Sequence, residues 1–443
     1  MLQISIRSIR QAIAAGALTV ATSIVFAPLA QAVEIQRVVS EKGVEAWLVE
    51  DHTVPIIAVN FSFKGGAAQD PEGKQGLNRL LASTLDEGAG ELTSEDFQAR
   101  LEDLSVSLGF DTGKDYFYGS LRTLKPNLSD AFDLLRLAIN EPRFDQDAVE
   151  RMQSQIAVGI RRRERDPDSI ASRNLLKVML GEHPYALRTS GSEESLMALT
   201  AEDLAAQRKR IFARNNLRIG VVGSIDAATL APFLDKVFDG LPEVGDLKPV
   251  PTLTAADGLE VEASLPVPQA KLVFALPALT RNDPDYQAAF VMNHILGGGS
   301  FTSWLYEEVR EKRGLTYSVG TSLSPYDAGG LLIGSAATRA DRADETLAVI
   351  LKQFERMAED GPTQAELDDA KRFLTGSYPL RFDASGKIAR QLVALQNADL
   401  GIDYFDRRNS EIEAVTLADV KRVAKRLLAG KTPSISVVGP AGG

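Results

Sequence analysis

The sequence predicts an α+β fold built from two homologous halves, each a mixed β-sheet with packed helices. The main observation is an internal repeat, because residues 199–223 and 415–439 align without a gap at an offset of 216. The second residue of each copy is a Thr that is followed three residues later by an Asp, as in a capping box. Apolar residues at helical spacing follow, and a β-rich run then ends at Val-Val-Gly. Strands and helices alternate too irregularly for a (β/α)₈ barrel or a doubly wound sheet.

The repeat divides the chain at a proline-bearing segment. We expect a first domain over residues 33–245, a linker over 246–258 and a second domain over 259–443. The linker contains Pro249 and Pro251 and few apolar anchors, which is typical of a semi-extended connection.

Both halves contain the elements that this fold requires. Runs rich in β-branched and aromatic residues predict strands at 44–51, 54–65, 116–124, 217–223, 270–276, 316–323, 330–336 and 434–439. Apolar residues at helical spacing predict helices at 93–108, 129–139, 145–162, 284–296, 302–312, 341–358 and 363–375.

Composition excludes several functional classes. The chain has 443 residues, no Cys and a formal charge of −11. Without Cys there is no disulfide scaffold, thiolate nucleophile or Cys-ligated metal site. An acidic chain without a large basic block is also a poor candidate for binding nucleic acid.

Residues 1–32 have the features of a secretory signal peptide. Arg7 and Arg10 precede a mostly apolar run over 12–30, and Ala30-Gln31-Ala32 matches the small-x-small cleavage pattern. A membrane anchor helix is the alternative, but the small residues and the late Pro28 favour removal. Cleavage would leave a charge of −13, since two Arg and no acid are lost. We expect a periplasmic protein with no stable membrane span, because no later run reaches 18 apolar residues.

Common catalytic motifs are absent from the sequence. It contains no G-x-S-x-G elbow, Walker A loop or G-x-G-x-x-G fingerprint. Its three histidines are too far apart to form a local zinc pair. We interpret His183 as a structural loop residue, His294 as a core or helix-terminal residue and His52 as a solvated turn residue.

The segment 303–323 carries the strongest candidate chemistry. Arg310 lies at the end of a predicted helix and Tyr317 starts the next strand, so the turn can bring both polar ends to one site. A guanidinium and a phenol are good donors to a carbonyl oxygen or a developing oxyanion. Alternatively, Arg310 pairs with Glu307 or Glu308 and Tyr317 is half-buried packing. The preceding glycine run, 297–300, is expected to be a turn or a flexible active-site loop.

These features together resemble the pitrilysin/insulinase-like zinc peptidases, specifically the mitochondrial-processing-peptidase type. The resemblance rests on Arg310-x-x-x-Gly-Leu-x-Tyr317, on Gly76-Leu77 opening a helix, on His183-Pro184-Tyr185 and on the duplication. It covers nearly all of 33–443. The individual motifs are modest, but their order and spacing are specific.

The sequence departs from this family at the zinc site. Active members carry H-x-x-E-H on the helix that follows the Gly76-Leu77 position. Here Arg79 and Ser83 replace the two His, and Ala82 replaces the Glu that activates water. The third ligand, a Glu in the family, most closely matches Gln155, with Glu150 as an alternative. We therefore expect no metal and no cofactor on this chain.

The resemblance implies a complex of two chains that enclose a chamber in a clamshell arrangement and contribute different residues to catalysis. It implies that this chain is a non-catalytic subunit that pairs with a homologous zinc-bearing subunit to hydrolyse peptides. Arg310 would bind the substrate carbonyl and Tyr317 would donate to the oxyanion, with backbone contacts to substrate from Gly298, Gly299 and Ser300.

Two other functions remain open at this stage. The chain could be a peptide-binding or scaffold protein that uses the peptidase fold only for assembly. It could also be an enzyme with unrelated chemistry, although the sequence offers no nucleophile–base pair for this.

Overall fold

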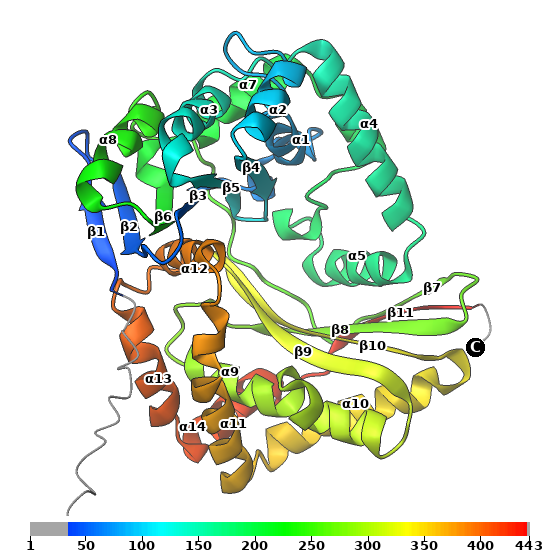
Figure 1. The fold of residues 1–443 in the computed structure, drawn as a ribbon. Coiled ribbons are helices and arrows are strands. Elements are labelled where there is room, and N and C mark those ends of the chain that lie inside the picture. Colours follow the sequence, from blue (N-terminus) through cyan, green and yellow to red (C-terminus); the bar gives the residue numbers. More distant parts are fainter. Residues whose placement is uncertain (1–33, 441–443) are drawn as a thin grey trace, which may run out of the picture. The chain divides into compact units, whose positions relative to one another are not determined.

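Two β-sheets, one in each half of the chain, organise the computed structural model, which describes residues 34–440 (Figure 1). The predicted signal segment, residues 1–32, lies outside the described residues. The first sheet has the order β1-β2-β6-β3-β5-β4. Its strands are β1 Gln36–Val39, β2 Glu45–Glu50, β3 Ile56–Lys64, β4 Ser107–Thr112, β5 Tyr116–Leu124 and β6 Leu217–Gly223.

The second sheet repeats the topology of the first except for the edge strand β1 of the first sheet, which has no counterpart. Its order is β7-β11-β8-β10-β9. The strands are β7 Glu260–Ser264, β8 Gln269–Ala278, β9 Thr316–Tyr326, β10 Gly329–Arg339 and β11 Ser434–Gly439. In the first sheet β6 pairs parallel with β2 and antiparallel with β3, and in the second β11 pairs parallel with β7 and antiparallel with β8. The predicted α+β fold with two homologous halves is therefore confirmed.

Helices of each half bury one face of that half's own sheet in a large apolar core. Those of the first half are α1 Leu77–Thr84, α2 Ser94–Asp103, α3 Leu128–Asn140, α4 Gln146–Arg163, α6 Glu193–Met197, α7 Ala201–Ile211 and α8 Ala227–Phe238. Those of the second half are α9 Tyr286–Asn293, α10 Ala343–Glu359, α11 Gln364–Gly376, α13 Tyr404–Ala414 and α14 Leu417–Leu428.

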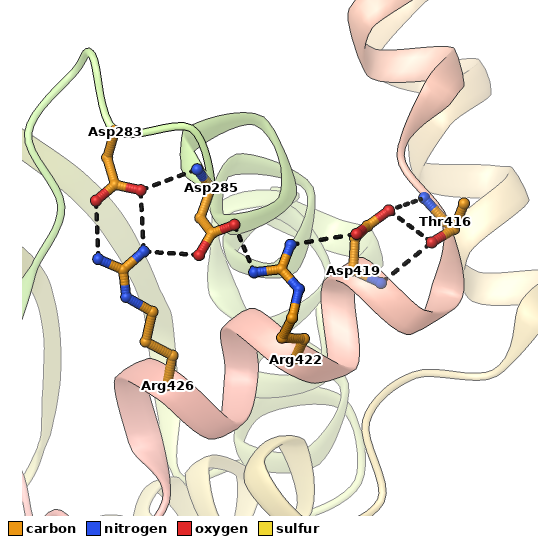
Figure 2. Close-up of polar contacts among 6 residues, drawn as sticks. All are labelled: Asp283, Asp285, Thr416, Asp419, Arg422 and Arg426. Carbon is orange, nitrogen blue, oxygen red and sulfur yellow. Dashed lines mark hydrogen bonds and ion pairs between the residues drawn. The ribbon is translucent and has the colours of Figure 1, made fainter.

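The two repeat helices, α7 and α14, begin with the predicted capping boxes. In α14 the Thr416 hydroxyl accepts from Asp419 N at 3.1 Å, and the Asp419 carboxylate accepts from Thr416 N at 3.0 Å. Figure 2 shows how this helix is then tied to the start of α9. Arg422 and Arg426 each contact the Asp285 carboxylate at 2.6 Å, which shares the buried charge between two cations.

The two halves exchange one helix each. Helix α5, Pro167–Leu180, belongs to the first half but packs on β8 and β11 of the second sheet. Helix α12, Ser385–Asn397, belongs to the second half but packs on β3 and β6 of the first sheet (Figure 1). Side chains of β8 alternate accordingly, since Phe274 enters the core of its own half while Val273 joins the cluster under α5. Each sheet is thus covered on both faces.

Several predicted boundaries differ from the structure. The helix expected over 93–108 ends at Asp103, because Ser105 has a φ of 52° and the chain then enters β4. Two helices, expected over 284–296 and 302–312, contain π-helical turns at His294–Gly298 and Tyr306–Glu311. Between residues 34 and 440, every helix is too short or too polar to cross a bilayer.

Candidate functional site

Arg310 and Tyr317 lie side by side, as the sequence predicts. Arg310 closes the π-helical turn Tyr306–Glu311, and Tyr317 is the second residue of β9. The Arg310 Cζ atom lies 4.7 Å from the centre of the Tyr317 ring and 4.7 Å from the centre of the Tyr306 ring. The guanidinium is therefore held between two aromatic faces, an arrangement that fixes its orientation and leaves its N–H edge available.

The acidic neighbours of Arg310 are largely engaged elsewhere. Glu308 bonds Lys312 and Arg313, both at 2.7 Å, and these two cations hold the pKa of Glu308 below its usual range. Glu307 contacts Lys312 at 2.9 Å. Among the carboxylates of residues 34–440, Arg310 itself reaches only Glu311, at 3.9 Å. The alternative in which Arg310 pairs with Glu307 or Glu308 is not what the structure shows.

Tyr317 is presented to solvent rather than packed. Its exposed fraction is 82%. Among the described residues its hydroxyl finds no hydrogen-bond partner, so it is a free donor at the surface. A phenol in this state can donate to an oxygen of an incoming ligand.

Two aromatic residues that the sequence analysis did not select extend the site. Tyr306 stacks on Arg310, and Phe301 meets Tyr306 edge to face at 4.9 Å. Phe301 is 74% exposed. The sequence spacing could have identified Tyr306, because this residue lies four positions before Arg310 and therefore on the same helical face.

The glycine run at 297–300 is closely packed. A Cβ on Gly298 would lie 2.6 Å from Asn293 Nδ2, and one on Gly299 would lie 2.7 Å from the His294 carbonyl oxygen. Gly297 approaches β9 so closely that a Cβ would lie 2.8 Å from Thr321 N. Gly298 and Ser300 are exposed, whereas Gly299 is buried. The glycines therefore let the π-helical turn pack against β9, four residues along the strand from Tyr317.

The positions that match the family's zinc ligands hold other interactions. Arg79 on α1 forms an ion pair with Asp111 on β4, with Nη1 and Oδ1 2.6 Å apart. Ser83 donates its hydroxyl to the Arg79 carbonyl oxygen at 3.0 Å, and Ala82 is buried in the core. Gln155 lies exposed on α4, which packs against α1. Within residues 34–440 no group of three His, Cys, Asp or Glu side chains could hold a metal ion.

Helix α1 is held in place by its N-terminal turn. Asp70 accepts hydrogen bonds from Gly76 N at 2.8 Å and Asn78 N at 3.0 Å, which satisfies free donors at the start of the helix. Burial raises the pKa of Asp70 to about 7. Gly76 has a φ of 97°, and a Cβ there would lie 2.6 Å from the Ser190 carbonyl oxygen. The helix that matches the family's zinc-binding helix is therefore present, but other residues occupy its ligand positions.

The three histidines lie apart and outside any metal site. His183 accepts from Tyr185 N at 3.1 Å and caps a short turn. His294 is buried at the end of α9, where its ring stacks on Phe373. His52 is exposed and contacts Ser224.

This duplicated sheet architecture, with exchanged helices and a substituted zinc helix, defines a metallopeptidase-like fold without its metal centre. Residues 198–374 match the family described as "Peptidase M16 inactive domain". This match, together with the relatives described below, supports the assignment of the chain to the peptidase M16 family, that of the pitrilysin/insulinase-like peptidases.

One relative and two solved structures illustrate the similarity. The "non-peptidase homolog YmxG" of Helicobacter pylori is 29% identical over 75% of this chain and 77% of its own length. A solved "peptidase M16 inactive domain" from Pseudomonas fluorescens is 29% identical, with a TM-score of 0.87 over 92% of this chain and 98% of its own. A protease from Helicobacter pylori, 18% identical with a TM-score of 0.83, covers 92% of this chain and 100% of its own and shows the same fold.

Proposed function

We propose that this chain is the non-catalytic subunit of a periplasmic zinc metallopeptidase heterodimer. Arg310 binds the carbonyl oxygen of the substrate near the scissile bond, and Tyr317 donates to the oxyanion of the tetrahedral intermediate. A homologous partner subunit supplies the zinc ion and the residue that activates water.

The observation that carries this proposal is the contrast between the two sites. At the zinc positions Arg79 is paired with Asp111, and its protonated guanidinium has no lone pair to offer a metal ion. At the other site Arg310 is fixed between two rings and Tyr317 is 82% exposed, with no partner among the described residues. Donors that are oriented in advance towards a developing charge are what oxyanion stabilisation requires.

Reconstitution tests the proposal. The mature chain alone should not cleave an unfolded peptide, whereas mixing it with a homologous zinc-bearing subunit should raise that subunit's activity. An Arg310→Ala mixture should lose about 100–1000-fold in rate, the usual effect of removing one oxyanion donor. Arg313→Ala, three residues further on and paired with Glu308, is the matched control and should keep the rate.

Other outcomes would contradict the proposal in distinct ways. If the Arg310→Ala mixture works at the full rate, the chain acts as a scaffold in the complex. If the single chain cleaves peptides in the presence of a chelator, it is an enzyme with unrelated chemistry.

Export is a separate part of the proposal. The predicted signal segment supports it, and N-terminal sequencing of the protein from a periplasmic extract should find a chain that begins near Val33. A chain that keeps residues 1–32 in the cytoplasmic fraction would contradict it.

A further inference from the structure

A cavity of about 940 Å³ lies within the described chain, away from Arg310 and Tyr317. Both halves line it, with Lys64 and Tyr116 from the first and Arg281, Tyr378 and Arg408 among those from the second. Six basic and three acidic side chains line the cavity, although the whole chain has a charge of −11. The cavity is therefore locally positive in an acidic protein, which calls for a specific explanation.

Three acidic side chains line the cavity, Asp115 from the first half and Asp327 and Asp399 from the second. Two of them, Asp115 and Asp327, are already engaged. Asp327 accepts from the Tyr116 hydroxyl at 2.9 Å and pairs with Lys64 at 2.8 Å. Asp115 accepts from the Tyr185 hydroxyl and from Asp327 N. The carboxylates of Asp115 and Asp327 thus already accept hydrogen bonds from neighbouring residues.

Three arginines without carboxylate partners among the described residues also line the cavity and form its basic wall. Arg408 is only 5% exposed, yet it contacts no carboxylate among the described residues and donates to the Leu374 carbonyl oxygen at 3.2 Å. Its guanidinium lies 3.8 Å from the centre of the Tyr378 ring. Burial lowers the pKa of Arg408, and repulsion from Arg381 and Arg281 adds to that effect. A buried charge without a counter-charge is costly, so an anion bound here would be strongly favoured.

The other two arginines of this wall are also without ion pairs in the described chain. Arg281 donates to the Tyr404 hydroxyl at 2.5 Å, and its guanidinium lies 4.2 Å from the centre of the Tyr286 ring. Arg381 is exposed and lines the same cavity. Both guanidiniums are close enough to Arg408 to lower its pKa.

The Tyr378 hydroxyl supplies an independent observation. Tyr378 is 6% exposed, and its hydroxyl is buried without a hydrogen-bond partner. Burial raises the pKa of this phenol to about 12, so it keeps its proton at neutral pH. A buried O–H without an acceptor is rare because it loses its hydrogen bond to water. Tyr378 also lines the cavity, and a small rotation of its side chain would let the hydroxyl donate to an acceptor oxygen there.

We propose that Arg281, Arg381, Arg408 and Tyr378 form a binding site for an oxyanion, a carboxylate or phosphate group carried by a small ligand or a peptide end. Guanidinium groups bind such oxyanions through paired N–H donors, and the neutral phenol adds an O–H donor. The cavity is large enough for a ligand of metabolite or short-peptide size, and its tyrosine rings offer apolar faces to the rest of that ligand. This site shares no residue with the Arg310–Tyr317 pair and needs no partner subunit.

Calorimetric titration of the isolated mature chain tests this site at constant ionic strength. The probes are inorganic phosphate, trialanine with a free carboxylate and the C-terminal amide of trialanine. We expect saturable binding of phosphate, of free trialanine or of both, and none of the amide. Phosphate alone would assign the site to phosphate groups, and free trialanine alone would assign it to peptide carboxylates.

Variants that keep the fold link binding to the cavity. Arg381→Gln changes an exposed residue, and Tyr378→Phe removes a hydroxyl that forms no hydrogen bond in the structure. Each should weaken binding about tenfold, as loss of one hydrogen bond to a charged group does. Arg372→Gln, an exposed arginine outside the cavity, is the control and should bind as the wild type does.

Three results would overturn the inference. These are no saturable binding of either oxyanion, equal binding of trialanine and its amide, and unchanged affinity in both Arg381→Gln and Tyr378→Phe. Because the assay uses neither zinc nor a second subunit, its outcome is independent of the proposed peptidase role.

Discussion

Replacing Gly220 with Ala should separate the exchanged helix α12 from the first sheet. Gly220 lies in β6 beneath that helix, and a Cβ there would lie 2.5 Å from the Ala389 carbonyl oxygen and 2.8 Å from Leu392 Cβ. Both contacts are made with the backbone or with the base of a side chain, so no flexible group can move aside. Helix α12 itself must shift.

The magnitude follows from what the shift disturbs. Overpacking of a close contact costs about 1–3 kcal/mol. The buried Gln396 side chain donates to the Ile219 carbonyl oxygen at 2.9 Å, and weakening this bond adds about 1 kcal/mol. We therefore expect Gly220→Ala to lower the free energy of unfolding by about 2–4 kcal/mol.

Urea denaturation of the mature chain measures this loss, and Gly386→Ala is the matched control. Gly386 lies in the first turn of the same helix, and no heavy atom comes within 4 Å of a Cβ placed there. That variant should gain about 0.5–1 kcal/mol, because Ala loses less backbone entropy than Gly in a helix. If Gly220→Ala matches the wild type in stability, or if the two variants lose the same amount, the close contact between α12 and β6 is not what the structure indicates.

Three further predictions address a buried carboxyl, the repeat and the metal. Burial raises the pKa of Asp86 to about 6, so the contribution of this carboxyl to stability falls as the pH rises from about 4 to 6, and Asp86→Asn lacks that contribution. Denaturation at pH 4 and at pH 7 measures the free energy of unfolding of the variant relative to the wild type. This difference should rise by about 2 kcal/mol between the two pH values, and a constant difference would refute the shifted pKa. Thr416→Ala should cost about 1 kcal/mol through the lost cap of α14, and an unchanged denaturation midpoint would contradict the role of the capping box. Elemental analysis of the dialysed mature chain should find no stoichiometric zinc, and one ion per chain would contradict the assignment of Arg79 and Ser83 to a substituted site.

Local sequence patterns predicted most strands because their apolar runs are short and end at clear turn residues. The repeat also predicted the matching sheets, since the helix and strand of each copy occupy equivalent places. The exchange of α5 and α12 could not be predicted in this way. Helical periodicity shows that a helix has an apolar face, but it does not show which sheet that face covers.

The candidate site was predictable where its residues are close in sequence. Arg310 and Tyr317 are seven positions apart, and a single helix-to-strand turn joins them, so their proximity followed from local geometry. The basic wall of the cavity was not predictable. Arg281, Arg381 and Arg408 come from separate segments, and only the packing of the second half brings them together.

The most direct test of the central claim is kcat/KM for peptide hydrolysis by the reconstituted heterodimer that carries Tyr317→Phe. This change removes one exposed hydroxyl and leaves the ring that stacks on Arg310. We predict a loss of about 100–1000-fold with unchanged affinity between the subunits. A heterodimer that keeps the wild-type kcat/KM would contradict the account, because this chain would then contribute no donor to the reaction.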